Sequence, residues 1–174
     1  MDHPHYIACH NKAFVNNYDL LKGIRPGGTF VLNCPWEGAE LVKNLPAETK
    51  RTLAEKKVKF YTIDAISIAG DLGLGNRINM VMQAAFFKLA NVIPVDQALD
   101  FLKDSVETLY GRKGQEIVAM NVAAIAQAAT SLKEIAVLPE GAHLRADSED
   151  DLRGAPPFVQ DIQVPMQRQE GDDL

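Results

Sequence analysis

Short apolar runs alternate with helical patterns along the first half of the chain. Three runs have the length and composition of buried strands, at residues 6–9, 29–33 and 59–63. Segments with helical spacing lie between and after them, at residues 12–22, 38–43, 47–57 and 65–72. Strands separated by helices favour parallel pairing through right-handed crossovers. The pattern predicts an α/β fold with a small, incomplete parallel sheet of about three strands, flanked by helices.

The carboxyl ends of these predicted strands carry polar residues. They are residues 9–11, residues 33–36 and Asp64. In an open parallel sheet such ends lie along one edge, where ligands bind. We therefore expect these three segments to share an edge.

The most apolar helical segment follows the glycine-containing turn at 73–75 and runs to Ala90. At 100° per residue, Asn76, Asn79 and Gln83 fall within about 60° of one another. A helix that is apolar nearly all round is normally buried, so we expect a core helix with polar groups at its N-terminal end. The amides either cap the helix and hold a neighbouring loop, or help its free N–H groups to bind an anion.

Two further helices and a tail complete the pattern. Residues 95–110 form a clean amphipathic helix, and residues 115–132 form a mostly apolar one that carries Asn121. Residues 139–174 hold nine of the 23 acidic residues but three of the 18 basic ones, for a net charge of −6. The sequence predicts a domain over residues 1–138 and an extended acidic linker over residues 139–174.

Composition narrows the class of protein. The chain has 174 residues, is 47% apolar and carries a net charge of −5, which favours one domain with a sizeable core and argues against nucleic-acid or anionic-membrane binding. No uncharged apolar run reaches about 18 residues, so we expect no membrane span. Cys9 and Cys34 form no C-x-x-C pair, so we expect no metal site and a reducing, cytoplasmic location.

No catalytic group of residues stands out. His10 could act as a base at a strand end, but no serine or cysteine nucleophile turn accompanies it. Cys9 is better explained as a buried thiol, and Trp36 as a packing residue. Arg77 and residues 112–113 could meet phosphates, although most surface cations are only solvated. Local chemistry alone indicates an α/β domain with an amide-lined or anion-binding pocket.

Several motifs together resemble the pyruvate:ferredoxin (flavodoxin) oxidoreductases. The most specific motif is Gly-Leu-Gly-Asn-Arg-Ile-Asn-Met-Val-Met-Gln-Ala-Ala-Phe-Phe-Lys-Leu-Ala-Asn-Val-Ile-Pro, residues 73–94. The others are residues 7–11, 27–33, 35–36, 59–61, 110–114 and 118–121, and the tail from residue 157 to 174. The resemblance covers nearly the whole chain and is to the third, or gamma, domain of the family.

The resemblance implies an oxidoreductase that decarboxylates pyruvate with coenzyme A, gives acetyl-CoA and CO2, and reduces ferredoxin or flavodoxin. Thiamine diphosphate and [4Fe–4S] clusters belong to domains that this chain does not contain. The family's gamma domain begins with further strands, a Gly-Ser-Asp-Gly-Thr turn and a lysine, none of which precedes Tyr6. The tail resembles the connector toward a ferredoxin-like domain. The resemblance thus implies a fragment of a homodimeric parent, inactive alone.

Within this segment the resemblance implies a coenzyme A site and no catalytic or metal-binding residue. Asn79 and Asn121 match asparagines that the family uses toward coenzyme A, and Arg77 is a weaker candidate. Two alternatives remain. The chain could be a non-enzymatic module or split subunit that docks on separately encoded catalytic subunits, or a generic coenzyme A-binding protein.

Overall fold

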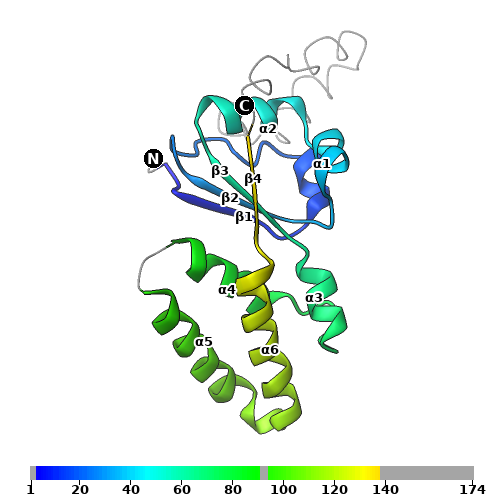
Figure 1. The fold of residues 1–174 in the computed structure, drawn as a ribbon, viewed down its shortest axis with the longest axis vertical. Helices are drawn as coiled ribbons and strands as arrows, with labels where there is room; N and C mark the ends of the chain where they lie inside the picture. The colour runs from blue at the N-terminus through cyan, green and yellow to red at the C-terminus, as the bar shows by residue number, and fades with distance from the viewer. Residues whose placement is uncertain (1–2, 91–93, 138–174) are drawn as a thin grey trace, which may run out of the picture. The chain divides into compact units, whose positions relative to one another are not determined.

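The computed structural model describes residues 3–90 and 94–137. It is an α/β protein with a four-stranded sheet in the order β1-β2-β3-β4 (Figure 1). The strands are β1 (Tyr6–Cys9), β2 (Thr29–Asn33), β3 (Lys59–Ile63) and β4 (Lys133–Ile135). The predicted fold class is confirmed, and the three predicted strands have the predicted bounds.

The backbone hydrogen bonds show that β2 and β3 are parallel. At the start of the pair the N–H of Lys59 donates to the carbonyl of Gly28 (2.8 Å), and at its end the N–H of Cys34 donates to Ile63 (3.0 Å). β4 follows the last helix and runs back along β3 in the opposite direction (Figure 1). The sheet is therefore parallel except at one edge.

The described residues fall into two compact units, and the first comprises residues 3–30, 36–60 and 135–137. It holds β1, the 3-10 helix η1 (Lys12–Asn16), the starts of β2 and β3, α1 (Gly38–Asn44) and α2 (Ala47–Glu55). Its core includes Phe30 and Phe60, which are 0% and 2% exposed and whose rings stack with centroids 5.4 Å apart. These aromatic residues from neighbouring strands hold the starts of β2 and β3 together.

Lys57 ends α2 in a left-handed backbone conformation. The N–H of Val58 donates to Leu53 (2.9 Å) and that of Lys57 donates to Ala54 (3.2 Å), which is the hydrogen-bond pattern of a Schellman motif. Lys57 occupies the position that normally holds glycine, with φ of 51°. A side chain in this conformation costs about 1 kcal/mol.

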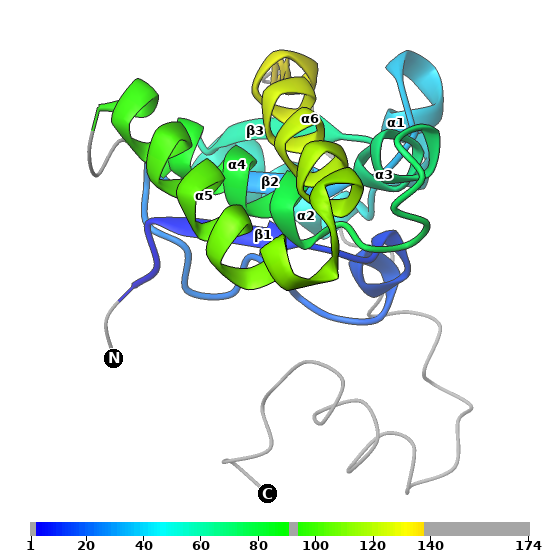
Figure 2. The ribbon, with the colours of Figure 1, turned by 90° about the horizontal axis from the view of Figure 1, so that it is seen from below.

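The second unit comprises residues 31–35 and 61–134. It holds the ends of β2 and β3 together with four α-helices, which are α3 (Ala65–Asp71), α4 (Asn79–Ala90), α5 (Val95–Tyr110) and α6 (Gln115–Ser131). The 3-10 turn η2 (Gly111–Lys113) joins α5 to α6. Helices α4, α5 and α6 pack against one another, and α3 packs on α4 and α6 (Figure 2).

Two elements differ from the prediction. The helix expected over residues 12–22 is only the 3-10 helix η1, after which residues 17–22 form turns. Asn16 and Asn17 stand at this point, and asparagine is a weak helix former. The sheet also gains β4, a three-residue strand without an apolar run of its own.

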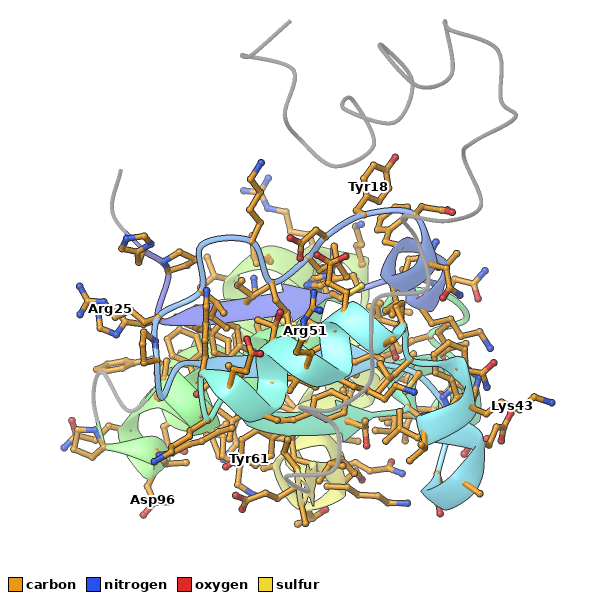
Figure 3. The ribbon with its side chains drawn as sticks, turned by 90° about the horizontal axis from the view of Figure 1, so that it is seen from above. Tyr18, Arg25, Lys43, Arg51, Tyr61 and Asp96 are labelled. Carbon is orange, nitrogen blue, oxygen red and sulfur yellow. The ribbon has the colours of Figure 1, made fainter. Side chains whose placement is uncertain are left out.

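β4 is hydrogen-bonded to β3, and within the second unit the Glu134 carboxylate of β4 lies close to the Tyr61 side chain of β3 (Figure 3). Burial and this carboxylate raise the pKa of Tyr61. The linker predicted over residues 139–174 lies outside the described residues. Among those that are described, no helix has both the length and the apolar character needed to cross a membrane.

Candidate functional site

Hydrogen bonds fix the loop between α3 and α4. The N–H of Leu74 donates to Ala69 (2.8 Å) and that of Gly73 donates to Gly70 (3.0 Å), so α3 also ends in a Schellman motif. Leu74 is 1% exposed and anchors the loop in the core. The Nε of Arg77 donates to the carbonyl of Leu74 (3.1 Å). An arginine held in this way still has its other guanidinium N–H groups for a ligand.

Gly73 brings this loop against α6. Its φ is +76°, and a Cβ added there would lie 3.3 Å from the Cε of Met120. Two features therefore favour glycine at position 73, namely the positive φ and the close approach of the Met120 side chain. The contact places the loop beside Met120, the residue that precedes Asn121.

Asn79 is the first residue of α4 and is exposed. Asn76 and Gln83 are exposed as well. The sequence predicted a core helix with polar groups at its N-terminal end, and in the structure these three polar side chains are exposed and the helix begins at Asn79 rather than directly after the glycines. The buried residues of α4 are Met80, Val81, Met82, Ala84 and Ala85. Asn79 and Gln83 thus lie on the open side of α4, whose other side is packed in the core, and Asn76 lies in the loop before it.

Asn121 differs from Asn79 because it is buried, with 5% of its surface exposed. Its Nδ2 donates to the carbonyl of Ile117, one turn earlier in α6 (2.8 Å). This bond satisfies part of the amide inside the apolar helix. The sequence indicated a polar residue in an apolar helix, and the structure places it in the core of the second unit.

The ends of β2 and β3 are joined by Asn33, one of the polar residues that the sequence analysis placed at this edge of the sheet. The Oδ1 of Asn33 accepts a hydrogen bond from the N–H of Ala65 (2.9 Å), and Asn33 is 2% exposed. Asp64 caps α3 by accepting from the N–H (3.1 Å) and the hydroxyl (2.7 Å) of Ser67. The sequence analysis assigned Asn33 to the edge but gave it no role of its own.

The side chains near the end of β1 offer little reactive chemistry. Cys9 is 4% exposed and its Sγ donates to the carbonyl of Asn11 (3.0 Å). Burial raises the pKa of this thiol, which keeps it protonated and inert, as the sequence analysis favoured. His10 is exposed. The ring of Trp36 lies 5.3 Å from the Nζ of Lys12, so it packs under a cation.

Residues 112–113 are exposed in the turn between α5 and α6, where the Nζ of Lys113 lies 5.4 Å from the Tyr110 ring. Among the residues that the structure describes, no three His, Cys, Asp or Glu side chains gather as a metal site would require. The α3–α4 loop and the start of α4 thus offer the guanidinium of Arg77, exposed amides and the N-terminal N–H groups of α4. Their chemistry suits an anion that also carries amides.

Comparison with known proteins identifies the family. The model of the family described as pyruvate ferredoxin/flavodoxin oxidoreductase matches residues 1–131. The chain belongs to this family.

Two relatives within the oxidoreductase family match the chain along its whole length. The pyruvate:ferredoxin oxidoreductase of Moorella thermoacetica and the pyruvate-flavodoxin oxidoreductase of Enterobacter agglomerans are each 47% identical over 174 residues, which is 100% of this chain. The chain spans 15% of the length of either relative.

One solved structure shows the same fold. It is the pyruvate oxidoreductase subunit PORC of Thermotoga maritima, which is 15% identical, with a TM-score of 0.61. The match covers 78% of this chain and 67% of that subunit. At this identity the likeness concerns the fold alone.

Proposed function

We propose that this chain is part of a pyruvate:ferredoxin or pyruvate:flavodoxin oxidoreductase and contributes to its coenzyme A site. The observation that carries the proposal is the identity of 47% to two named oxidoreductases over all 174 residues. Because the chain spans 15% of their length, the catalytic chemistry belongs to the whole enzyme. That enzyme decarboxylates pyruvate oxidatively with coenzyme A to give acetyl-CoA and CO2.

The residues of the α3–α4 loop fit the chemistry of coenzyme A. Coenzyme A carries phosphate groups at one end and an arm with amide groups. Arg77 is exposed and can offer N–H groups to phosphate oxygens, which guanidinium groups bind well. Asn79 is exposed and its amide can both donate to and accept from another amide. We propose that these two side chains, with the N-terminal N–H groups of α4, hold the ligand.

Asn121 has a different part in this proposal. Its Nδ2 is engaged with Ile117, and its side chain is buried in α6. The contact between Gly73 and Met120 places α6 directly against the loop that carries Arg77. Asn121 would either bind coenzyme A with the amide groups that the bond to Ile117 does not use, or form part of the surface behind the loop.

The remaining cofactors and partners belong to the whole enzyme. Thiamine diphosphate and [4Fe–4S] clusters would be held by its other domains, and ferredoxin or flavodoxin would accept the electrons. We also propose a homodimer in the cytoplasm for the whole enzyme. The chain alone should not release CO2 from pyruvate, even with thiamine diphosphate and an electron acceptor.

The test uses the full-length enzyme that contains this segment. Arg77→Ala and Asn79→Ala should each raise the KM for coenzyme A by about tenfold, the effect of one lost hydrogen bond to a charged or buried group. The KM for pyruvate should stay unchanged. Gln127→Ala is a matched control, because Gln127 is an exposed amide on α6. An unchanged KM for coenzyme A in both loop variants would refute the site.

The alternative is a separately encoded module that docks on catalytic subunits. The same fold occurs in a subunit of the Thermotoga maritima pyruvate oxidoreductase. Sequencing the genomic DNA on both sides of this reading frame separates the two proposals. A frame that continues on both sides indicates a fragment of one long chain, whereas stop codons on both sides with neighbouring genes for the missing parts indicate a subunit.

A further inference from the structure

The side chain of Met120 forms a contact between α6 and the loop that carries Arg77. A Cβ added at Gly73 would lie 3.3 Å from the Cε of Met120 and 3.7 Å from its Sδ. The φ of Gly73 is +76°, a conformation that favours glycine, so the loop has no side chain of its own at this point. The thioether of Met120 therefore packs directly against the backbone of the loop.

Hydrogen bonds connect this part of the backbone to the candidate site. The N–H of Gly73 donates to Gly70 (3.0 Å), and the N–H of Leu74 donates to Ala69 (2.8 Å). The carbonyl of Leu74 accepts from the Nε of Arg77 (3.1 Å). A displacement of the backbone at Gly73 would therefore act on Leu74, and through Leu74 on the guanidinium of Arg77.

Met120 differs in exposure from the methionines of α4. Met80 and Met82 are 5% and 3% exposed, whereas Met120 is only partly buried. A small oxidant in water can reach a partly exposed thioether, while the side chains packed around a buried one protect it. Among the residues that the structure describes, Met120 is thus the methionine most open to oxidation.

Oxidation would change both the shape and the polarity of the contact with Gly73. Methionine is flexible and apolar, and its sulfoxide is polar and chiral. The added oxygen is bound to Sδ, one of the two Met120 atoms that face Gly73. The oxidised side chain either pushes on the loop or turns toward water. In both cases the thioether no longer supports the loop.

We propose that Met120 is a redox-sensitive positioning residue for the coenzyme A site. A peroxide transfers one oxygen atom to the Sδ of Met120. The O–O bond breaks, an S–O bond forms and the sulfur is oxidised by two electrons, while hydrogen peroxide leaves as water. The α3–α4 loop then loses its support on α6 and coenzyme A binds more weakly. A methionine sulfoxide reductase that uses two thiols would restore the thioether and release water and a disulfide.

This inference rests on the proposed function, because it requires the α3–α4 loop to hold coenzyme A. The loss of support is measured on the 174-residue chain without coenzyme A. The effect on coenzyme A is measured in the full-length enzyme. Failure of the inference and failure of the proposed function therefore give different results.

The first experiment treats the 174-residue chain with hydrogen peroxide. Peptide mass spectrometry measures the rate of oxidation at Met80, Met82 and Met120. We expect Met120 to be oxidised about tenfold faster than the two buried methionines. Equal rates at the three positions would overturn the proposal.

Amide hydrogen exchange then follows the loop in the oxidised chain. The amide protons of Gly73 and Leu74 should exchange about tenfold faster after oxidation, because the backbone that holds them has lost its support. Those of Val31 and Leu32, in a buried strand of the same unit, should keep their rates. Acceleration at all four amides would indicate general unfolding, and no acceleration would indicate that the contact does not hold the loop. Either result would overturn the proposal.

The Met120→Leu chain, treated with peroxide in the same way, is the matched control. It keeps the other four of the five methionines, so any effect of their oxidation remains. Peroxide should not accelerate exchange at Gly73 and Leu74 in this chain. Equal acceleration with and without Met120 would overturn the proposal, because oxidation elsewhere would then be the cause.

In the full-length enzyme, substitutions replace the oxidant, so that no other group is oxidised. Met120→Gln places a polar group where oxidation would place a sulfoxide, and Met120→Leu keeps an apolar side chain. The KM for coenzyme A should be about tenfold higher in Met120→Gln than in Met120→Leu, with the same kcat and the same KM for pyruvate. Ala119→Gln and Ala119→Leu form the matched pair on an exposed neighbour in α6, and should not differ in this way.

The loop variants Arg77→Ala and Asn79→Ala distinguish the two proposals. If they raise the KM for coenzyme A while Met120→Gln and Met120→Leu have equal KM values, the site stands and the role of Met120 is overturned. If neither loop variant changes this KM, the proposed site is wrong and the role of Met120 falls with it.

Discussion

Asn33 and Ala65 join the ends of two parallel strands in the second unit through one buried hydrogen bond, from the Ala65 N–H to the Asn33 Oδ1 at 2.9 Å. Asn33 is the last residue of β2, and Ala65 is the first residue of α3, two residues after the end of β3. The bond gives a partner to an N–H at the start of α3 that no residue of the helix can satisfy. The side chain therefore fixes the point where the chain leaves the sheet toward the α3–α4 loop.

Removing this side chain should destabilise the fold. Asn33→Ala leaves the N–H of Ala65 buried without its acceptor, so we expect the free energy of unfolding to fall by about 1–3 kcal/mol. Urea denaturation followed by circular dichroism measures the change. Asn44→Ala is the control, because the Asn44 amide makes an exposed hydrogen bond to Glu40. A loss no larger than that of the control would show that the buried bond is not important.

A substitution at Lys57 should stabilise the fold instead. Lys57→Gly relieves the left-handed conformation with φ of 51°, so the free energy of unfolding should rise by about 1 kcal/mol. Lys57→Ala keeps the Cβ and its strain, and should give no such gain. The two variants together separate backbone relief from removal of the charge. Equal stability of the alanine and glycine variants would argue against strain at this position.

The sequence predicted the strands well for a physical reason. Residues 29–33 and 59–63 are short runs rich in β-branched and aromatic residues, and their side chains fill the core of the sheet. β4 could not be predicted in this way. Residues 133–135 contain two charges and become a strand because β3 offers an edge and Tyr61 a partner for Glu134. Such a strand depends on tertiary pairing, which no local pattern encodes.

At the candidate site, too, the local sequence pattern could not specify which side chains are buried. The pattern placed Asn79 on a helix that is apolar nearly all round, and burial followed from that pattern. The structure buries only one side of α4, because α3, α5 and α6 pack on it and leave the face of Asn79 open. Asn121 is buried on a helix of similar composition. Which face of an apolar helix is covered depends on its neighbours, and composition does not specify them.

Alkaline pH should weaken the fold through Tyr6 and Cys9. Burial raises the pKa of Tyr6 from 10.0 to about 12, and it also raises the pKa of Cys9 above its usual 9.0. The folded chain then keeps protons that the unfolded chain loses. This contribution to stability is complete below about pH 9 and declines as the pH rises toward 12.

Urea unfolding at pH 8 and pH 11 measures this loss. Tyr6→Phe should reduce the difference between the two pH values, because it removes the tyrosine whose pKa burial raises to about 12. Tyr18→Phe serves as the control, since Tyr18 is 42% exposed. Stability that is the same at both pH values in the unmodified chain would contradict the prediction.

Gly73 provides the last prediction, which links the stability of the fold to the candidate site. Gly73→Ala places a Cβ at φ of +76° and 3.3 Å from the Cε of Met120. The left-handed conformation alone should cost about 1 kcal/mol, and displacement of the Met120 side chain should add to it. Thermal unfolding measures the total. Gly70→Ala is a matched control within α3, where an added Cβ meets nothing within 4 Å and helix propensity favours alanine.

A double variant separates the two causes. Met120→Leu shortens the side chain that faces Gly73, so Gly73→Ala should cost less in the Met120→Leu background than alone, while the backbone cost remains. Because Met120 precedes Asn121 and Gly73 belongs to the loop that carries Arg77, the displacement should also move the loop away from α6. In the full-length enzyme, Gly73→Ala should therefore raise the KM for coenzyme A more than Gly70→Ala does. If both variants have the same KM, the contact between Gly73 and Met120 stabilises the fold without positioning the site.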